Sequence, residues 1–196
     1  MTWWAKELLR SLRFLAANGQ EGFWRSKRVY ELVVPGAIAL VGAILAIQYP
    51  LLLAADIVSK LANGLFQFMV FVVPFHLAAL AAVATFTREE LDKGLTGTDV
   101  TLRVWDNETS EYFYKSLTLR QYTCLLFGYL CTIGLAFILV YIVASGLNLS
   151  WLFGKQIENV QKLTLFFLVF YLAHYGIMTI YAVTFLFDKV SRIEEK

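Results

Sequence analysis

Residues 68–80 read FMVFVVPFHLAAL, an apolar run that carries Pro74 and His76 near its middle. The run belongs to a longer uncharged stretch, Leu61–Thr87. Because a helix rises about 1.5 Å per residue, about 20 consecutive apolar residues cross the roughly 30 Å hydrocarbon core of a bilayer. The stretch therefore predicts a transmembrane helix, and a proline and a histidine inside such a helix need an explanation.

Three more uncharged stretches are long enough to cross a bilayer, namely Leu32–Ala55, the first two-thirds of Gln121–Gly154, and Leu163–Phe187. Of the 196 residues, 59% are hydrophobic and 16% are charged, whereas soluble domains carry about 25% charged residues. The sequence therefore predicts an all-α polytopic membrane protein. Its four transmembrane helices are expected near residues 32–54, 63–86, 121–145 and 163–187.

Lysine and arginine are distributed unevenly over the segments between these helices. Fourteen of the 17 lie before the first span, between the second and third spans, or after the fourth. Cytoplasmic segments of membrane proteins carry the excess of positive charge, so both termini and the middle loop are expected in the cytoplasm. The expected organisation is a cytoplasmic-face segment at 1–31, a transmembrane hairpin at 32–86, a cytoplasmic loop at 87–120, a second transmembrane hairpin at 121–187 and a cytoplasmic tail at 188–196.

The N-terminal segment contains two basic features. Residues 2–19, TWWAKELLRSLRFLAANG, place apolar side chains at helical spacing and basic side chains on the other side. This pattern predicts an amphipathic helix that lies in the membrane interface. A cluster of Arg25, Lys27 and Arg28 then directly precedes the first span. The cluster fits attraction to anionic lipid, and it also fits a site for the phosphates of a nucleotide-type signal.

The middle loop contains a predicted β-hairpin. Val100, Leu102 and Val104 alternate with polar or aromatic residues, which is typical of a strand. A turn follows at Asp106-Asn107, and Glu111–Leu117 can return as a second strand. Because a two-stranded hairpin is marginal in water, it is expected to pack on the membrane, a sister subunit or a cytoplasmic partner protein, the alternative being a solvated connector. The candidate partner-binding residues are Val100, Leu102, Trp105, Tyr112 and Tyr114.

The two histidines of the chain lie at nearly the same expected depth. His76 is twelve residues from Arg88, at the cytoplasmic end of the second span, and His174 is fourteen residues from Asp188 in the fourth. These separations correspond to roughly 18 and 21 Å of helix, close to the middle of the bilayer. Ionisable residues at that depth normally face the interior of a helix bundle or a wet cavity.

Other residues accompany both histidines. Pro74 frees backbone carbonyls for neighbouring groups, and several tyrosines share a helix face with His174. The candidate intramembrane polar network is His76, Pro74, Tyr171, His174, Tyr175 and Tyr181. Three roles fit it: hydrogen bonds between helices, the constriction or gate of a pore, and a metal or haem site. The last role has the smallest basis, because two histidines without a carboxylate form a small ligand set.

Several classes of function are disfavoured by residues that the sequence lacks. The four expected spans contain no Asp, Glu, Lys or Arg, whereas proton-coupled transporters normally need such a relay. The sequence has no phosphate-binding glycine loop and no His-Glu-x-x-His motif, and Cys124 and Cys131 lack further zinc ligands nearby. We therefore expect no enzymatic activity, no cofactor and no metal. A net charge of +2 gives no reason to expect DNA binding.

Small residues recur at helix-packing spacing, as at Gly128, Thr132 and Ala136. With an arm and a loop too small to fold alone, they favour a homo-oligomer, and a tetramer is the expected size. The layout of four spans, an amphipathic arm, cytoplasmic ends and a modest cytoplasmic loop resembles the membrane subunits of bacterial antiphage defence systems, such as the Kiwa membrane subunit and the Hailong channel effector. The resemblance implies a homo-oligomer of the bacterial inner membrane, paired with a cytoplasmic protein or a nucleotide-derived signal.

The function expected from layout and resemblance together is a gated pore or membrane effector that is controlled from the cytoplasm. One alternative is a non-conducting sensor or anchor that recruits a cytoplasmic partner through the loop. A further alternative is an accessory subunit of a larger membrane complex. The resemblance transfers no functional residue to this chain.

Overall fold

The computed structural model describes residues 9–17, 26–49, 56–87, 89–94, 100–106, 111–147 and 154–191. Four helices in this part of the chain are long and apolar enough to cross a membrane. They are α2 (Val34–Gln48), which continues from the π-helical turn η2 (Val29–Val33), α3 (Ile57–Thr85), α4 (Leu119–Ser145) and α6 (Ile157–Ser191), which follows the short η5 (Gly154–Gln156). The prediction of a mostly helical protein is confirmed, and so is the prediction of four helices long and apolar enough to cross a membrane.

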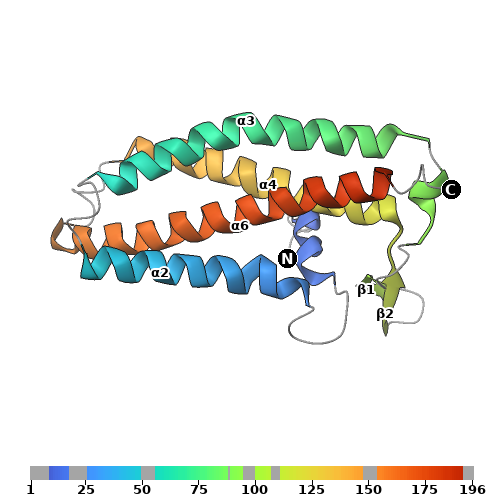
Figure 1. The fold of residues 1–196 in the computed structure, drawn as a ribbon, viewed down its shortest axis with the longest axis horizontal. Coiled ribbons are helices and arrows are strands. Elements are labelled where there is room, and N and C mark those ends of the chain that lie inside the picture. The colour runs from blue at the N-terminus through green and yellow to red at the C-terminus, as the bar shows by residue number, and fades with distance from the viewer. Residues whose placement is uncertain are drawn as a thin grey trace.

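The four helices lie side by side with their long axes roughly aligned (Figure 1). α3 packs along α4, and α6 contacts α2, α3 and α4. Within the described residues, α2 makes no close backbone approach to α3 or α4. α6 is therefore the helix that joins the other three.

The core of the bundle lies between α3, α4 and α6. Met69, Leu130 and Met178, one from each helix, are completely buried there. Many other large apolar side chains point outward, as Phe71 and Phe187 do. Exposed apolar surface of this extent marks a membrane or protein contact, and on all four helices it suits lipid as the surrounding medium.

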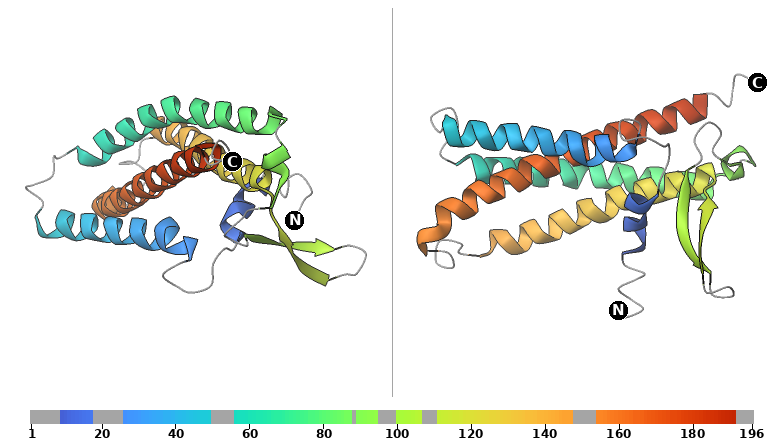
Figure 2. Two further views of the ribbon diagram at one scale, coloured as in Figure 1. Left: turned by 45° about the vertical axis from the view of Figure 1, so that its right-hand side comes forward. Right: turned by 90° about the horizontal axis from the view of Figure 1, so that it is seen from below.

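The segments outside the long helices gather toward one end of the bundle (Figures 1 and 2). They include η1 (Arg10–Ala16), η4 (Glu89–Asp92) and the predicted hairpin, which is present. Its strands β1 (Thr101–Asp106) and β2 (Glu111–Ser116) are antiparallel, with Trp105 opposite Tyr112. The C-terminal ends of α2 and α4 and the N-terminal ends of α3 and α6 lie at the other end of the bundle (Figure 1).

Two polar contacts fix the start of α4 beside the hairpin. Thr118 and Gln121 form a capping box, in which each side chain accepts a hydrogen bond from the other residue's backbone N–H. Arg120 holds both carboxylate oxygens of Asp92, at 2.7 and 3.1 Å, and donates to the carbonyl of Val83 at 2.9 Å. The end of α3, η4 and the start of α4 are thereby joined.

The described part of the N-terminal arm differs from the expected amphipathic helix. It is a seven-residue 3₁₀ helix, η1, which stands across the bundle (Figure 2). Phe14 is its buried side chain, while Leu9 and Leu15 are exposed. A 3₁₀ helix has about three residues per turn, so residues three apart share a face. Leu12 and Leu15 therefore share one face of η1, and Ser11 and Phe14 share another, which meets α4. Residues 1–8 lie outside the described residues, and the interfacial helix stays a prediction for them.

Candidate functional site

His174 of α6 connects two other segments of the chain inside the bundle. Its Nδ1 lies 2.5 Å from the carbonyl oxygen of Glu31, and its Nε2 lies 2.7 Å from the hydroxyl of Tyr129. A carbonyl oxygen only accepts hydrogen bonds, so in the neutral ring Nδ1 carries the hydrogen and Nε2 accepts from Tyr129. The imidazole thereby holds η2 and α4 to α6.

The side chain of Glu31 forms a buried ion pair with Lys27. Lys27 Nζ lies 3.2 Å from Glu31 Oε1, and the two residues are 8% and 1% exposed. Burial lowers the pKa of Lys27 below its ordinary value, and the nearby carboxylate opposes this shift. Since a buried pair loses its hydration and is often replaceable by apolar residues without loss of stability, its presence suggests a role beyond packing.

Phe14 brings the N-terminal arm into the same contact. The ammonium of Lys27 donates to the carbonyl of Phe14 and lies 3.8 Å from the centroid of its ring. The same ring lies against Tyr129 and Tyr122, with centroids 5.4 and 5.7 Å apart. Ser11 Oγ also lies 2.7 Å from Thr132 Oγ1 of α4. We call Phe14, Lys27, Glu31, Tyr129 and His174 the arm-locking cluster.

A second contact joins the same helices nearer the hairpin end. The hydroxyls of Tyr122 in α4 and Tyr181 in α6 lie 2.9 Å apart. The ring of Tyr30, from η2, lies against Tyr181 with centroids 5.0 Å apart. η2 is therefore connected to α4 and α6 at two levels, by a histidine and by a group of tyrosines.

The tyrosine and histidine residues predicted on one face of α6 all form hydrogen bonds to other helices. Besides the bonds of His174 and Tyr181, Tyr171 donates to the carbonyl of Ile133 at 2.8 Å. Tyr175 Oη lies 3.1 Å from Nδ1 of His76 in α3. These side chains connect α6 to α3 and α4, and their role in a pore stays a prediction.

His76 and Pro74 occupy different sides of α3. His76 is buried and meets Tyr175, the residue after His174, so the two histidines lie at the same level of the bundle. Pro74 is exposed on the outer side of α3, which continues through it as one helix. Of the six predicted network residues, His76 and Tyr175 bond to each other. His174, Tyr171 and Tyr181 bond to other residues of α4 or η2, and Pro74 points outward.

The five predicted partner-binding residues of the hairpin divide into two groups. Val100 and Leu102 are buried against the bundle. Trp105, Tyr112 and Tyr114 are exposed, and the rings of Trp105 and Tyr112 meet edge to face at 4.8 Å. The apolar residues attach the hairpin to the protein, and the aromatic residues remain accessible for a partner.

The predicted basic cluster before the first span does not form one surface. Lys27 is buried in the arm-locking cluster, while Arg28 is exposed. Arg25 lies outside the described residues. The ligand role of this cluster stays a prediction.

Phe14, Glu31 and Tyr129 are the members of the arm-locking cluster that sequence reasoning missed, and Glu31 is the one that carries charge. The first span was expected to begin at residue 32 and to hold no charge, but the apolar helix extends over Val29–Ala46 and includes Glu31. The spacing of four between Lys27 and Glu31 is the signal that could have indicated an ion pair on a helix. Nothing in the local sequence indicated that the pair is buried, because the residues that bury it lie far along the chain.

The described part of the chain contains no group of three or more His, Cys, Asp or Glu that could hold a metal ion. The absence of a cofactor stays a prediction. Comparison with protein families, curated proteins and solved structures found no match. The function is therefore argued from the geometry of the site.

Proposed function

We propose that this is a multi-pass protein of the bacterial inner membrane, with its termini and hairpin in the cytoplasm. The charge distribution supports this orientation. Arg13, Arg28 and Arg103 are among the cations toward the hairpin end, whereas at the other end Lys60 and Lys162 each pair with an acid one turn away. An excess of positive charge marks the cytoplasmic side.

The orientation is testable at the exposed hairpin. Tyr114→Cys, in a chain without Cys124 and Cys131, should react with a membrane-impermeant maleimide only after the inner membrane is opened. Labelling of intact spheroplasts would place the hairpin on the outer side and overturn the orientation.

We further propose that the protein is an oligomeric membrane effector, with a tetramer as the expected size, and that its N-terminal arm controls it from the cytoplasm. The observation that carries this proposal is the contact of Phe14 with the buried Lys27–Glu31 pair. The arm supplies a carbonyl acceptor and an aromatic face to an ammonium that has little access to water. Withdrawal of the arm removes both.

Arm withdrawal leaves the Lys27–Glu31 ion pair, one helical turn apart at the start of the first span, and this pair is then stabilised only if water reaches it. Withdrawal of the arm therefore favours an arrangement of helices that admits water to this ion pair. The tyrosine and histidine side chains on one face of α6 are already hydrogen-bonded to α3 and α4. We therefore place the water-filled path between copies of the chain rather than within one bundle.

Dye release from proteoliposomes tests the effector function. Vesicles containing the wild-type protein should retain the dye in the absence of the signal, and vesicles containing Phe14→Ala should leak. The matched control is Leu15→Ala, because Leu15 is exposed on the same helix. Sealed vesicles with the inserted Phe14→Ala protein would contradict control by the arm.

A setting in antiviral defence is proposed from the resemblance of the layout alone. Cells that carry the gene with its genomic neighbours should show a reduced efficiency of phage plating. Phe14→Ala should instead arrest growth without infection. Equal plating on cells with and without the gene, for a broad phage panel, would remove this setting and leave the membrane function open.

The second candidate function is a non-conducting sensor or anchor, and the three exposed aromatic residues of the hairpin favour it. Aromatic side chains are enriched in protein interfaces, and Tyr112 and Tyr114 are 57% and 66% exposed. Under this function, Tyr112→Ala/Tyr114→Ala should lose a co-purifying cytoplasmic protein while still inserting into the membrane. Unchanged recovery of that protein would count against it.

A further inference from the structure

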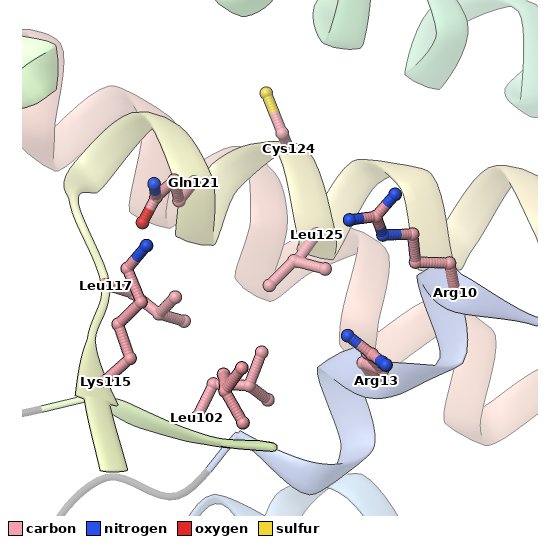
Figure 3. Close-up of a pocket in the computed structure, with 9 residues that line it drawn as sticks. Arg10, Arg13, Leu102, Lys115, Leu117, Gln121, Cys124 and Leu125 are labelled. Carbon is pink, nitrogen blue, oxygen red and sulfur yellow. The ribbon is translucent and has the colours of Figure 1, made fainter. Parts of the chain in front are cut away.

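A pocket of about 380 Å³ lies between the arm, the hairpin and the first turns of α4. Its volume is in the range of small-ligand sites, about 300–1,000 Å³. Arg10 and Arg13 of η1 line it on one side and Lys115 of β2 on the other, with Leu102 and Leu125 between them (Figure 3). The pocket thus combines basic side chains from two elements with an apolar floor.

Arg13 and Lys115 give the pocket positive charge, and neither has a counterion among the described residues that line it. Neither Arg13 nor Lys115 forms an ion pair within the described part of the chain, and no carboxylate lines the pocket among the described residues. Cations held together by separate elements repel each other unless an anion lies between them. The guanidinium of Arg13 offers a fork of donors that matches phosphate oxygens, and Lys115 offers a point charge.

In the proposed orientation, with the start of α4 at the membrane surface, the pocket lies at the depth of the lipid headgroups. Gln121 and Leu125 line it two and six residues after the first residue of α4, which is roughly 3 and 9 Å along the helix. With the start of α4 at the membrane surface, this range spans the interfacial layer, about 5–8 Å thick on each side of the hydrocarbon core. A phospholipid places its phosphate and the first carbons of its chains at this level.

We infer that the pocket binds a phosphate-bearing anion, with the phosphate between Arg13 and Lys115 and any apolar part on Leu102 and Leu125. An anionic phospholipid offers both the charge and the apolar part, and a soluble phosphate compound offers the charge. The inference is independent of the proposed effector function, because binding is measured without any flux across a membrane.

Native mass spectrometry of the purified full-length protein tests the inference. The protein is equilibrated in detergent with phosphatidylglycerol or with zwitterionic phosphatidylcholine, and retained lipid is counted. Arg13→Gln/Lys115→Gln should bind phosphatidylglycerol about thirtyfold more weakly, since each cation close to an anionic lipid contributes a factor of about five.

Two variants control this measurement. Lys60→Gln/Lys162→Gln removes the same charge from the opposite end of the bundle and should bind like the wild type. Arg13→Lys/Lys115→Arg keeps both charges and should retain the lipid, which separates loss of charge from loss of fold.

Competition with inorganic pyrophosphate distinguishes the two sources of phosphate. Phosphatidylglycerol retention that depends on Arg13 and Lys115 and survives excess pyrophosphate identifies the lipid. Pyrophosphate binding that depends on the same residues, without preference for phosphatidylglycerol, identifies a soluble compound. Equal binding by the wild type and the double glutamine variant, or binding of neither probe, overturns the inference.

Discussion

Gly134 of α4 lies in a tight contact between three helices. A Cβ at this position would lie 2.5 Å from Cγ2 of Val73 and 3.0 Å from the hydroxyl of Tyr175. We expect Gly134→Ala to destabilise the folded bundle by about 1–3 kcal/mol and to lower its melting temperature in detergent. Gly176→Ala is the matched control, because a Cβ there would have nothing within 4 Å. Equal melting temperatures of the two variants would contradict tight packing of the three helices at Gly134.

The ion pair of the arm-locking cluster is the second feature at the residue scale. Lys27→Met should reduce the free energy of unfolding by about 3–5 kcal/mol, because Glu31 then remains buried without its partner. Lys27→Met/Glu31→Gln should recover most of this loss. Thermal melting in detergent measures both.

The matched control for that pair is Lys60→Met, whose partner Asp56 is exposed. An exposed pair contributes between about 0 and 1 kcal/mol, so this variant should melt close to the wild type. If Lys27→Met/Glu31→Gln is as unstable as Lys27→Met alone, the lost free energy of unfolding does not arise from the unpaired Glu31 carboxylate.

At the scale of elements, Arg120 joins α3, η4 and α4. Arg120→Lys keeps the charge but cannot span both oxygens of Asp92 and the Val83 carbonyl, because an ammonium lacks the planar fork of donors. We expect faster amide hydrogen exchange in η4 and at the end of α3. Lys93→Arg, in the segment after η4, is the control and should leave exchange unchanged.

The Arg120–Asp92 contact also predicts how hydrogen exchange in η4 depends on pH. Arg120 holds the pKa of Asp92 below its ordinary value of 3.8. A carboxylate with a lowered pKa contributes its stability above the ordinary value and loses it as the pH falls through the lowered value. Exchange in η4 should therefore be unaffected by this group between neutral pH and mildly acidic pH, and a loss of protection near neutral pH would contradict the assignment.

The elements that could be predicted from sequence depend on local pattern. Four long apolar runs specified four helices, and the alternation around Leu102 specified a strand, because length and spacing are properties of one segment. The buried face of η1 and the burial of Glu31 could not be predicted in this way. The carbonyl of Glu31 meets His174, 143 residues away, and no local pattern encodes a partner at that distance.

At the scale of the whole molecule, α2 is attached to the bundle mainly through α6. Gly42 faces this contact, since a Cβ there would lie 3.5 Å from Cγ1 of Val169. Gly42→Leu should separate the two helices and speed amide exchange in α2, while exchange in α3 and α4 stays unchanged. Gly36→Leu is the control, because a Cβ at Gly36 would have nothing within 4 Å. Equal loss of protection in all four helices would indicate a single cooperative unit instead.

Tyr175 and His174 are consecutive on α6, yet one bonds His76 of α3 and the other bonds Tyr129 of α4. Consecutive residues of a helix point about 100° apart, so no turn of α6 about its own axis can keep both bonds. α3, α4 and α6 are consequently held as one unit, in which α6 cannot rotate about its own axis without breaking at least one of these bonds. The bond from His174 to the Glu31 carbonyl extends the same constraint to η2 and to α2, which continues from it.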